Sequence, residues 1–205
     1  MASAIIHLAI AKELEKEFSI KNKKDYFLGS IAADISKEIN QDRNISHFIT
    51  TKDEIPNINL FTNKYPNFKS NSFELGYFIH LYTDKLWRTF IKDKITPNSI
   101  KLTDGTIYKT TFEEVSKMIY SDYTNLNIKV IENHFLDLSL FYEEFQIPFT
   151  SFNEIPINKL NILIDKMGII IENSKENKPY CFDIDSIEEF ISSSTITIKN
   201  ILSKY

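Results

Sequence analysis

The feature that most constrains the fold is an apolar segment of helical periodicity over residues 72–94. Its apolar side chains recur at spacings of three and four residues around much of a helical surface. They are Phe73, Tyr77, Phe78, Leu81, Leu86, Trp87 and Phe90. A helix that is apolar nearly all round must be covered by other elements, so the sequence predicts a central helix here.

The composition favours further helices around this one. The chain has only four Gly and six Pro, and so few chain breakers suit long helices better than a turn-rich sandwich or barrel. With 205 residues, 42% of them hydrophobic and 13% aromatic, the chain can bury a core and is too apolar for disorder. We therefore expect an all-α fold, a single-domain multi-helix bundle over residues 1–205.

The charge and cysteine content limit the possible partners and compartment. A net charge of -4 provides no global basic field for nucleic acid or an anionic membrane. No apolar run approaches the ~20 residues that span a bilayer, and residues 1–18 lack the early positive charge of a signal peptide. A lone cysteine, Cys181, excludes an internal disulfide and a cysteine-based zinc site, and it fits a reducing compartment. We expect a cytoplasmic protein.

Other elements follow from periodicity and capping residues. Ser3 can cap a helix that extends to about Phe18, and Thr111 with Glu114 forms a capping-box pattern for a helix to about Tyr123. Residues 40–71 contain Pro56 and are expected to form a long irregular connection. Further helices are expected over residues 25–39, 128–145, 157–173 and 186–191, with a hairpin or plain loop over 95–108. The β-branched run 194–198 weakens the prediction of the last helix.

Histidines and buried carboxylates are the side chains most suited to chemistry. The chain has four histidines, of which His7, His47 and His80 lie in apolar or aromatic settings within the first 80 residues. His80 and Asp84 are four residues apart on the predicted central helix, so their side chains share one face and can bind one ion. An aspartate on a buried helix needs a partner or a cation. The alternative for Asp84 is pairing with Lys85 or Arg88 at the helix surface.

Asp34 is a second candidate because it ends a run of small and apolar residues, 29–34. Small residues allow backbones to approach closely around a crowded site. Asp34 could instead be a solvated aspartate at a hinge. His7 could likewise be a core histidine with one hydrogen bond, and the setting of His47 leaves its role open.

Four sequence elements occur in one order: a histidine on the first helix, Gly-Ser-Ile-Ala-x-Asp, Ser-His-Phe, and Gly-Tyr-Phe-x-His-x-x-x-Asp. Through these four elements, the chain resembles the zinc-dependent phospholipase C family, relatives of the P1-type zinc nucleases, over about residues 1–88. The resemblance implies an all-helical bundle of that type. It also implies zinc ligands at five positions: His7, Asp34, His47, His80 and Asp84.

The same resemblance implies individual roles for these residues. Asp84 would bridge two ions, with Asp34, His47 and His80 on one ion and His7 on the other. Asp34 would also act as the general base. Zinc-bound water ionises near neutral pH and can attack phosphorus, so the implied reaction is hydrolysis of a phosphoester.

The chain departs from the family pattern beyond residue 88. The secreted bacterial enzymes use a mature N-terminal residue and further downstream His and Glu ligands, whereas only His134 remains downstream in this chain. We therefore expect one or two zinc ions instead of three. Asp122 follows an apolar turn and is flanked by Tyr120 and Tyr123, which makes it the best downstream carboxylate for completing a metal site. An ordinary helix-end aspartate is the alternative.

The sequence thus predicts a zinc-dependent hydrolase that acts on a phospholipid or on a soluble phosphodiester or monoester through metal-activated water. Two alternatives stay open. One is a nucleotide phosphohydrolase of the His-Asp superfamily, although no histidine here is directly followed by aspartate. The other is a non-catalytic helical protein that binds metal or a protein partner.

Overall fold

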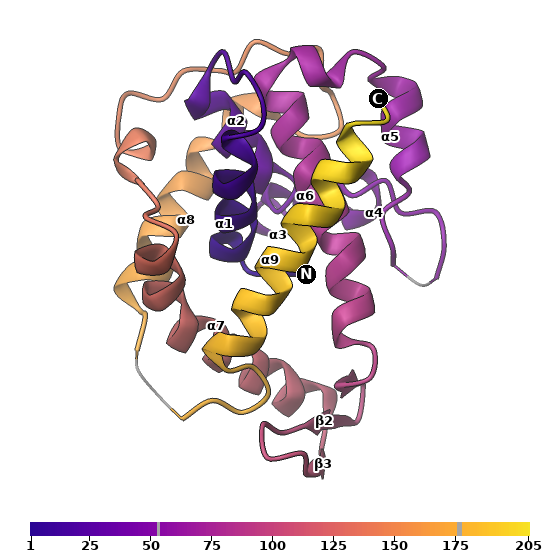
Figure 1. Cartoon of the computed structure of the whole chain (residues 1–205), viewed down its shortest axis with the longest axis vertical. Coiled ribbons are helices and arrows are strands. Elements are labelled where there is room, and N and C mark those ends of the chain that lie inside the picture. Colours follow the sequence, from indigo (N-terminus) through magenta and orange to yellow (C-terminus); the bar gives the residue numbers. More distant parts are fainter. Residues whose placement is uncertain (53, 176–177) are drawn as a thin grey trace.

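The central element of the fold is α6 (Ser72–Ile91), which is buried without a break from Phe73 to Asp84. The structure, a computed structural model that describes residues 1–52, 54–175 and 178–205, is mainly helical (Figure 1). Helices α1 (Ala4–Glu15), α2 (Lys23–Ala32), α5 (Ile58–Lys64) and α9 (Ile184–Leu202) all contact α6. The predicted central helix is confirmed, and the side chain of Asn71 caps it by accepting the N–H of Glu74.

Helices α2 and α6 approach each other until their backbones touch. A Cβ atom placed on Gly29 of α2 would lie 2.1 Å from the carbonyl oxygen of Phe73, and one on Gly76 of α6 would lie 2.0 Å from that of Tyr26. No side chain fits such distances, so this pair of helices requires glycine at both positions. The predicted close approach at residues 29–34 is therefore present at Gly29.

Two predicted caps are confirmed, but the helix after the second is longer than expected. The Ser3 hydroxyl accepts the N–H of Ile6, and that of Thr111 accepts the N–H of Glu114. Helix α7 (Phe112–Asn133) continues through the polar stretch that was expected to separate two helices, and residues 139–141 form only a 3₁₀ turn. The Thr124 hydroxyl donates to the carbonyl oxygen of Tyr120 one turn back, so it does not interrupt the helix.

The expected helix over residues 25–39 is divided, since α2 ends at Ala32 and α3 (Ile35–Glu38) follows a turn. The expected irregular connection over 40–71 contains three short helices instead. They are α4 (Arg43–Ser46), α5 and the 3₁₀ helix η1 (Phe68–Ser70). Asp42 caps α4 and Asn57 caps α5 through their side-chain oxygens, so polar residues of this connection begin helices.

The C-terminal helix is also longer than the sequence suggests. Helix α8 (Asn161–Glu172) follows the 3₁₀ helix η3 (Ile157–Lys159), and α9 begins after Asp183, whose side chain accepts the N–H of Ser186. The β-branched run 194–198 lies inside α9. Apolar side chains of α9 such as Ile187, Ile191 and Ile198 are buried, and the helix packs against α1 and α6 (Figure 1). Tertiary packing thus outweighs the low helix propensity of the run.

A small antiparallel sheet lies beyond the C-terminal end of α6 (Figure 1). Its strands are β1 (Ile95–Thr96), β2 (Ser99–Lys101) and β3 (Ile107–Lys109), in the order β1-β2-β3. Of the two possibilities for residues 95–108, the hairpin is present. Within the described ranges, no helix is long and apolar enough to cross a membrane.

Candidate metal centre

The five residues implied by the family resemblance meet in the interior of the protein. His7 comes from α1, Asp34 from the turn between α2 and α3, His47 from the end of α4, and His80 and Asp84 from α6. The three histidines are 0% exposed and Asp84 is 1% exposed, whereas the Asp34 side chain is 16% exposed. Asp34 therefore forms the side of the cluster nearest to solvent.

His80 is oriented by the neighbouring helix. Its Nδ1 lies 2.9 Å from the carbonyl oxygen of Ser30, the residue after Gly29 at the α2–α6 contact. A carbonyl oxygen can only accept, so Nδ1 carries the hydrogen and the Nε2 lone pair faces the cluster. Metal-binding histidines are commonly fixed in this way by a backbone carbonyl.

His47 is oriented by a serine. Its Nδ1 lies 2.8 Å from the Ser46 hydroxyl, which can donate its own hydrogen to the carbonyl oxygen of Arg43 at 3.2 Å. In that arrangement Nδ1 donates to Ser46 and the His47 Nε2 is unprotonated, 3.3 Å from the Nε2 of His80. Burial lowers the pKa of His47 to about 3 and that of His80 well below its ordinary value. Two neutral rings then direct lone pairs at each other, an arrangement that a shared cation would relieve.

The backbone after His47 is held in a conformation unusual for its residue type. Phe48 has φ 53°, in the left-handed region, which costs a side-chain-bearing residue about 1–2 kcal/mol. Its ring packs edge-on against Phe61 and Phe152. Burial of these aromatic rings offsets the backbone cost. The turn at Phe48 ends α4 and leaves His47 beside α6.

The two oxygens of Asp84 face different imidazoles. Oδ1 lies 3.5 Å from Nε2 of His7 and accepts the N–H of Ala2, whereas Oδ2 lies 3.5 Å from Nε2 of His47 and 3.1 Å from Nη2 of Arg43. Burial by itself raises the pKa of Asp84, but the nearby N-terminal ammonium and the neighbouring His7 outweigh it and hold that pKa well below its ordinary value. The carboxylate is therefore ionised.

The expected surface alternative for Asp84 is not the arrangement found. Asp84 is buried and its ionic partner is Arg43, while the guanidinium of Arg88 pairs with Glu54. Asp84 is thus the buried carboxylate that the sequence predicted on the central helix.

Several polar atoms of the cluster are buried without a hydrogen-bond partner. They include both ring nitrogens of His7 and Oδ1 of Asp34. The His7 ring stacks on that of His80, with centroids 3.9 Å apart and planes 10° apart. Burial raises the pKa of Asp34 to about 6. Buried polar atoms normally have partners, and a cation bound among these residues would supply one.

Among the residues that the structure describes, two overlapping donor groups could hold a metal ion. Within each, one ligand atom per residue lies within 4.8 Å of the others: His7, Asp34 and His80 form one group, and His47, His80 and Asp84 the other. This division differs from the one implied by the family, because His80 belongs to both groups and Asp84 to one. Imidazole nitrogens with carboxylate oxygens are a donor set that zinc accepts.

Asp122, expected to complete the site, is not part of either group. Its carboxylate accepts the backbone N–H groups of Tyr180, Cys181 and Phe182 at 2.7, 2.7 and 2.9 Å. These charge-assisted hydrogen bonds satisfy the carboxylate and fasten the segment before α9 to α7. Of the two flanking tyrosines, Tyr123 is buried and its hydroxyl donates to the carbonyl oxygen of Met1, whereas Tyr120 is exposed. His134 likewise lies elsewhere, between Glu13 and Glu188.

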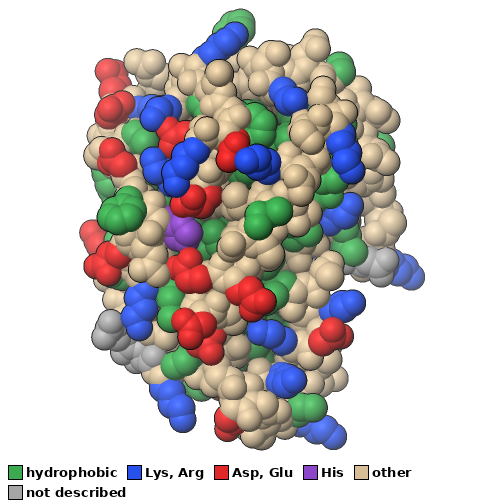
Figure 2. All heavy atoms as spheres, viewed as in Figure 1, with side chains coloured by type: hydrophobic (Ala, Val, Ile, Leu, Met, Phe, Trp, Pro, Cys, Tyr) green, Lys and Arg blue, Asp and Glu red, His purple; other side chains and the backbone are tan. Residues whose placement is uncertain are grey.

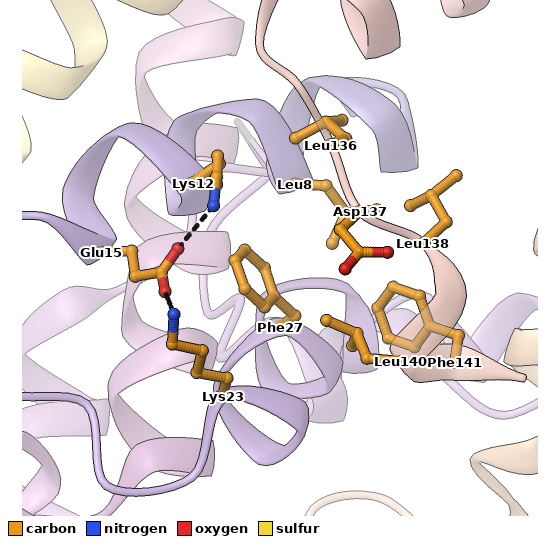
Figure 3. A pocket seen from close by; sticks show the side chains of 10 residues that line it. All are labelled: Leu8, Lys12, Glu15, Lys23, Phe27, Leu136, Asp137, Leu138, Leu140 and Phe141. Atoms are coloured by element: carbon orange, nitrogen blue, oxygen red, sulfur yellow. Dashed lines mark hydrogen bonds and ion pairs between the residues drawn. The ribbon is translucent and has the colours of Figure 1, made fainter. Parts of the chain in front are cut away.

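A cavity of about 80 Å³ lies on another side of α1 (Figure 3). Apolar side chains make up most of its wall, and its charged rim includes Lys12 and Lys23, both paired with Glu15. None of the five clustered residues lines it. Since the two lysines are already neutralised, this cavity is a weaker candidate for phosphate chemistry than the His-Asp cluster.

Comparisons with known proteins do not assign the chain, since no family model, no curated protein and no solved structure matched it.

The sequence reasoning overlooked three residues that serve the cluster: Ser30, Ser46 and Arg43. Ser30 and Ser46 stand inside the motifs that carry the family resemblance, so their supporting role could have been inferred from position. Arg43 stands outside those motifs and only the structure brings it to Asp84.

Proposed function

We propose that this chain is a zinc-dependent phosphoester hydrolase of the phospholipase C-like type, with one or two ions held by His7, Asp34, His47, His80 and Asp84. The observation that carries the proposal is the convergence of buried nitrogen and oxygen donors that lack partners or face each other. Hydrogen bonds to Ser30 and Ser46 leave two Nε2 atoms directed at one point. A divalent cation there would satisfy donors that hydrogen bonds within the described chain leave unused.

When bound, zinc would acidify water and neutralise charge on the phosphoryl oxygens. The protein side chains would then have distinct tasks. Asp84 supplies negative charge on the inner side of the centre, where it is 1% exposed. Asp34 lies nearest to solvent, so it is the carboxylate placed to accept the proton of an attacking water.

The charge on the molecular surface bears on which phosphoesters could be substrates. The face of the molecule shown in Figure 2 carries acidic and basic side chains side by side, without a uniform basic surface to attract anionic lipid. This mixed charge gives no preference for anionic lipid, and soluble phosphodiesters and monoesters are candidate substrates beside phospholipids.

A second candidate function uses the same ions without catalysis. The three histidines are fully buried, which restricts the approach of a substrate to the Asp34 side of the cluster. An ion held there could serve only to fasten α1, α4 and α6 together. This reading corresponds to a helical metal-binding or interaction protein.

The test is purification without chelators, elemental analysis, and a panel of bis-(p-nitrophenyl) phosphate, p-nitrophenyl phosphate and phosphatidylcholine. The proposal expects about one or two zinc ions per chain and turnover of at least one substrate, abolished by chelation and restored by zinc. Bound zinc without turnover would support the structural role of the ion. A chain that binds no zinc would remove both readings.

A further inference from the structure

We propose that Arg43 is an exchangeable counter-ion of this centre. Its guanidinium pairs with Asp84 when no metal ion shares that carboxylate, and it binds the phosphoryl oxygens of the substrate when one does. The inference rests on the proposed function, because it names the substrate-binding group of the same site.

The position of Arg43 at the edge of the cluster is the first support. Arg43 is the first residue of α4, and its Nη2 lies 3.1 Å from Oδ2 of Asp84. The arginine side chain is 28% exposed whereas Asp84 is 1% exposed. The guanidinium therefore lies between the buried carboxylate and solvent. Its Nε is directed at the sulfur of Met1, a weak acceptor that holds it loosely.

The second support is that one carboxylate would have to serve two cations once a metal ion binds. Oδ2 of Asp84 accepts the guanidinium and also lies 3.5 Å from the unprotonated Nε2 of His47, and both residues belong to the His47–His80–Asp84 donor group. Arginine stays protonated at any physiological pH, so it cannot relieve the conflict by losing its charge. A divalent ion bound to that oxygen would repel the guanidinium, and the long, partly exposed side chain can turn toward solvent.

The chemistry of the released group indicates its ligand. A guanidinium presents parallel N–H donors in a planar fork that matches two oxygens of a phosphate. Arg43 stays beside the centre after release, because it belongs to the same short helix that ends at His47. A phosphoester that approaches from the exposed side of Asp34 would meet this cation close to the cluster. Because Arg43 leaves Asp84 only when a metal ion takes its place, the metal ion binds first and phosphate binds second.

The alternative is a permanent ion pair that only holds α4 to α6. The two possibilities predict opposite effects of removing Arg43 on the affinity for metal. For a permanent pair, removal of Arg43 disturbs His47 and weakens metal binding. For an exchangeable counter-ion, removal of Arg43 strengthens metal binding, since it eliminates a competing charge, and weakens phosphate binding.

The experiment compares the full-length chain with Arg43→Met, Arg43→Lys and the control Arg88→Met. Arg88 lies one turn beyond Asp84 on α6 and pairs with Glu54, which makes it a matched arginine. Zinc affinity is measured by competition with a chromophoric chelator, and inorganic phosphate binding to the zinc-loaded protein by calorimetry. We expect Arg43→Met to bind zinc roughly tenfold more tightly and phosphate about tenfold or more weakly. Arg88→Met should match the wild-type chain in both measurements.

Arg43→Lys keeps the charge but loses the planar fork. It should bind zinc like the wild-type chain and phosphate with intermediate affinity. It also provides a second test if Arg43→Met fails to fold, as judged by circular dichroism. Weaker zinc binding with unchanged phosphate binding in Arg43→Met, or no change in either, would overturn the exchange. If the wild-type chain binds no zinc, the proposed function itself fails, and that result is distinct from either pattern.

Discussion

Replacing Gly76 by alanine should separate α2 from α6 and thereby disturb the proposed metal centre. The new Cβ would lie 2.0 Å from the carbonyl oxygen of Tyr26 and 2.9 Å from the backbone nitrogen of Ser30. Both obstacles are backbone atoms, so the helices must move apart by about 1 Å or more, and we expect a loss near or above the upper end of overpacking costs, about 3 kcal/mol. In a chain of this size that is roughly 6–12 °C in melting temperature.

The same displacement should reach the histidines. The bond from His80 Nδ1 to the Ser30 carbonyl oxygen, 2.9 Å long, spans the two helices and would not survive such a separation. Loss of a group that orients a metal ligand typically weakens metal binding by about 10–100-fold. Stability is measured by urea denaturation, and zinc affinity by chelator competition on the folded variant.

Gly168→Ala is the matched control for this substitution. Gly168 also lies inside a helix, α8, but the nearest atom to its added Cβ is the Tyr142 hydroxyl at 3.5 Å. With room for the methyl group, alanine should stabilise this helix by about 1 kcal/mol and leave zinc binding unchanged. If Gly76→Ala is as stable as Gly168→Ala, or binds zinc like the wild-type chain, the reasoning that links the helix contact to the centre is refuted.

Three further predictions concern the centre and its surroundings. Asp84→Asn should lose at least one zinc ion together with activity, because the amide cannot offset the charge of a cation. Asp34→Asn should retain more zinc but lose most turnover. Measuring zinc content and reaction rate for both variants decides whether the two residues have different roles. Chelation should lower the melting temperature and added zinc should restore it by mass action, so an unchanged melting curve in a verified metal-free sample argues against binding to the native state. Asp122→Asn should reduce the free energy of unfolding by about 1–3 kcal/mol, because one carbonyl oxygen replaces a carboxylate that accepts three N–H groups. The variant should bind as much zinc as the wild-type chain. A loss of zinc would make Asp122 a candidate ligand again.

The sequence was most informative where pattern and chemistry coincide. The apolar periodicity of residues 72–94 predicted the central helix, and the caps at Ser3 and Thr111 are present. The five motif residues converge although they are spread over residues 7–84, because each sits in a segment whose apolar neighbours must face the same core. Their use as zinc ligands is still a prediction.

Helix boundaries were least predictable where local propensity and tertiary packing disagree. The stretch around Thr124 contains residues that favour turns, yet Asn125 and Asn127 are both buried within α7. The β-branched residues 194–198 favour strands, but their helix buries Ile198 against the core. In both cases the decisive energy comes from contacts with distant segments, which a window of neighbouring residues does not contain.

Asp34 and Asp122 show why a carboxylate among apolar neighbours does not identify its own partner. Both are flanked by buried residues and both carry a raised pKa, in each case chiefly because burial removes water from the carboxylate. Asp122 meets three backbone N–H groups at a chain segment nearly 60 residues away, which satisfies it without an ion. Asp34 meets imidazoles, and its buried Oδ1 finds no hydrogen-bond donor. Burial tells us that a carboxylate needs a partner, but only the groups that reach it from other parts of the chain decide whether that partner is the backbone or a cation.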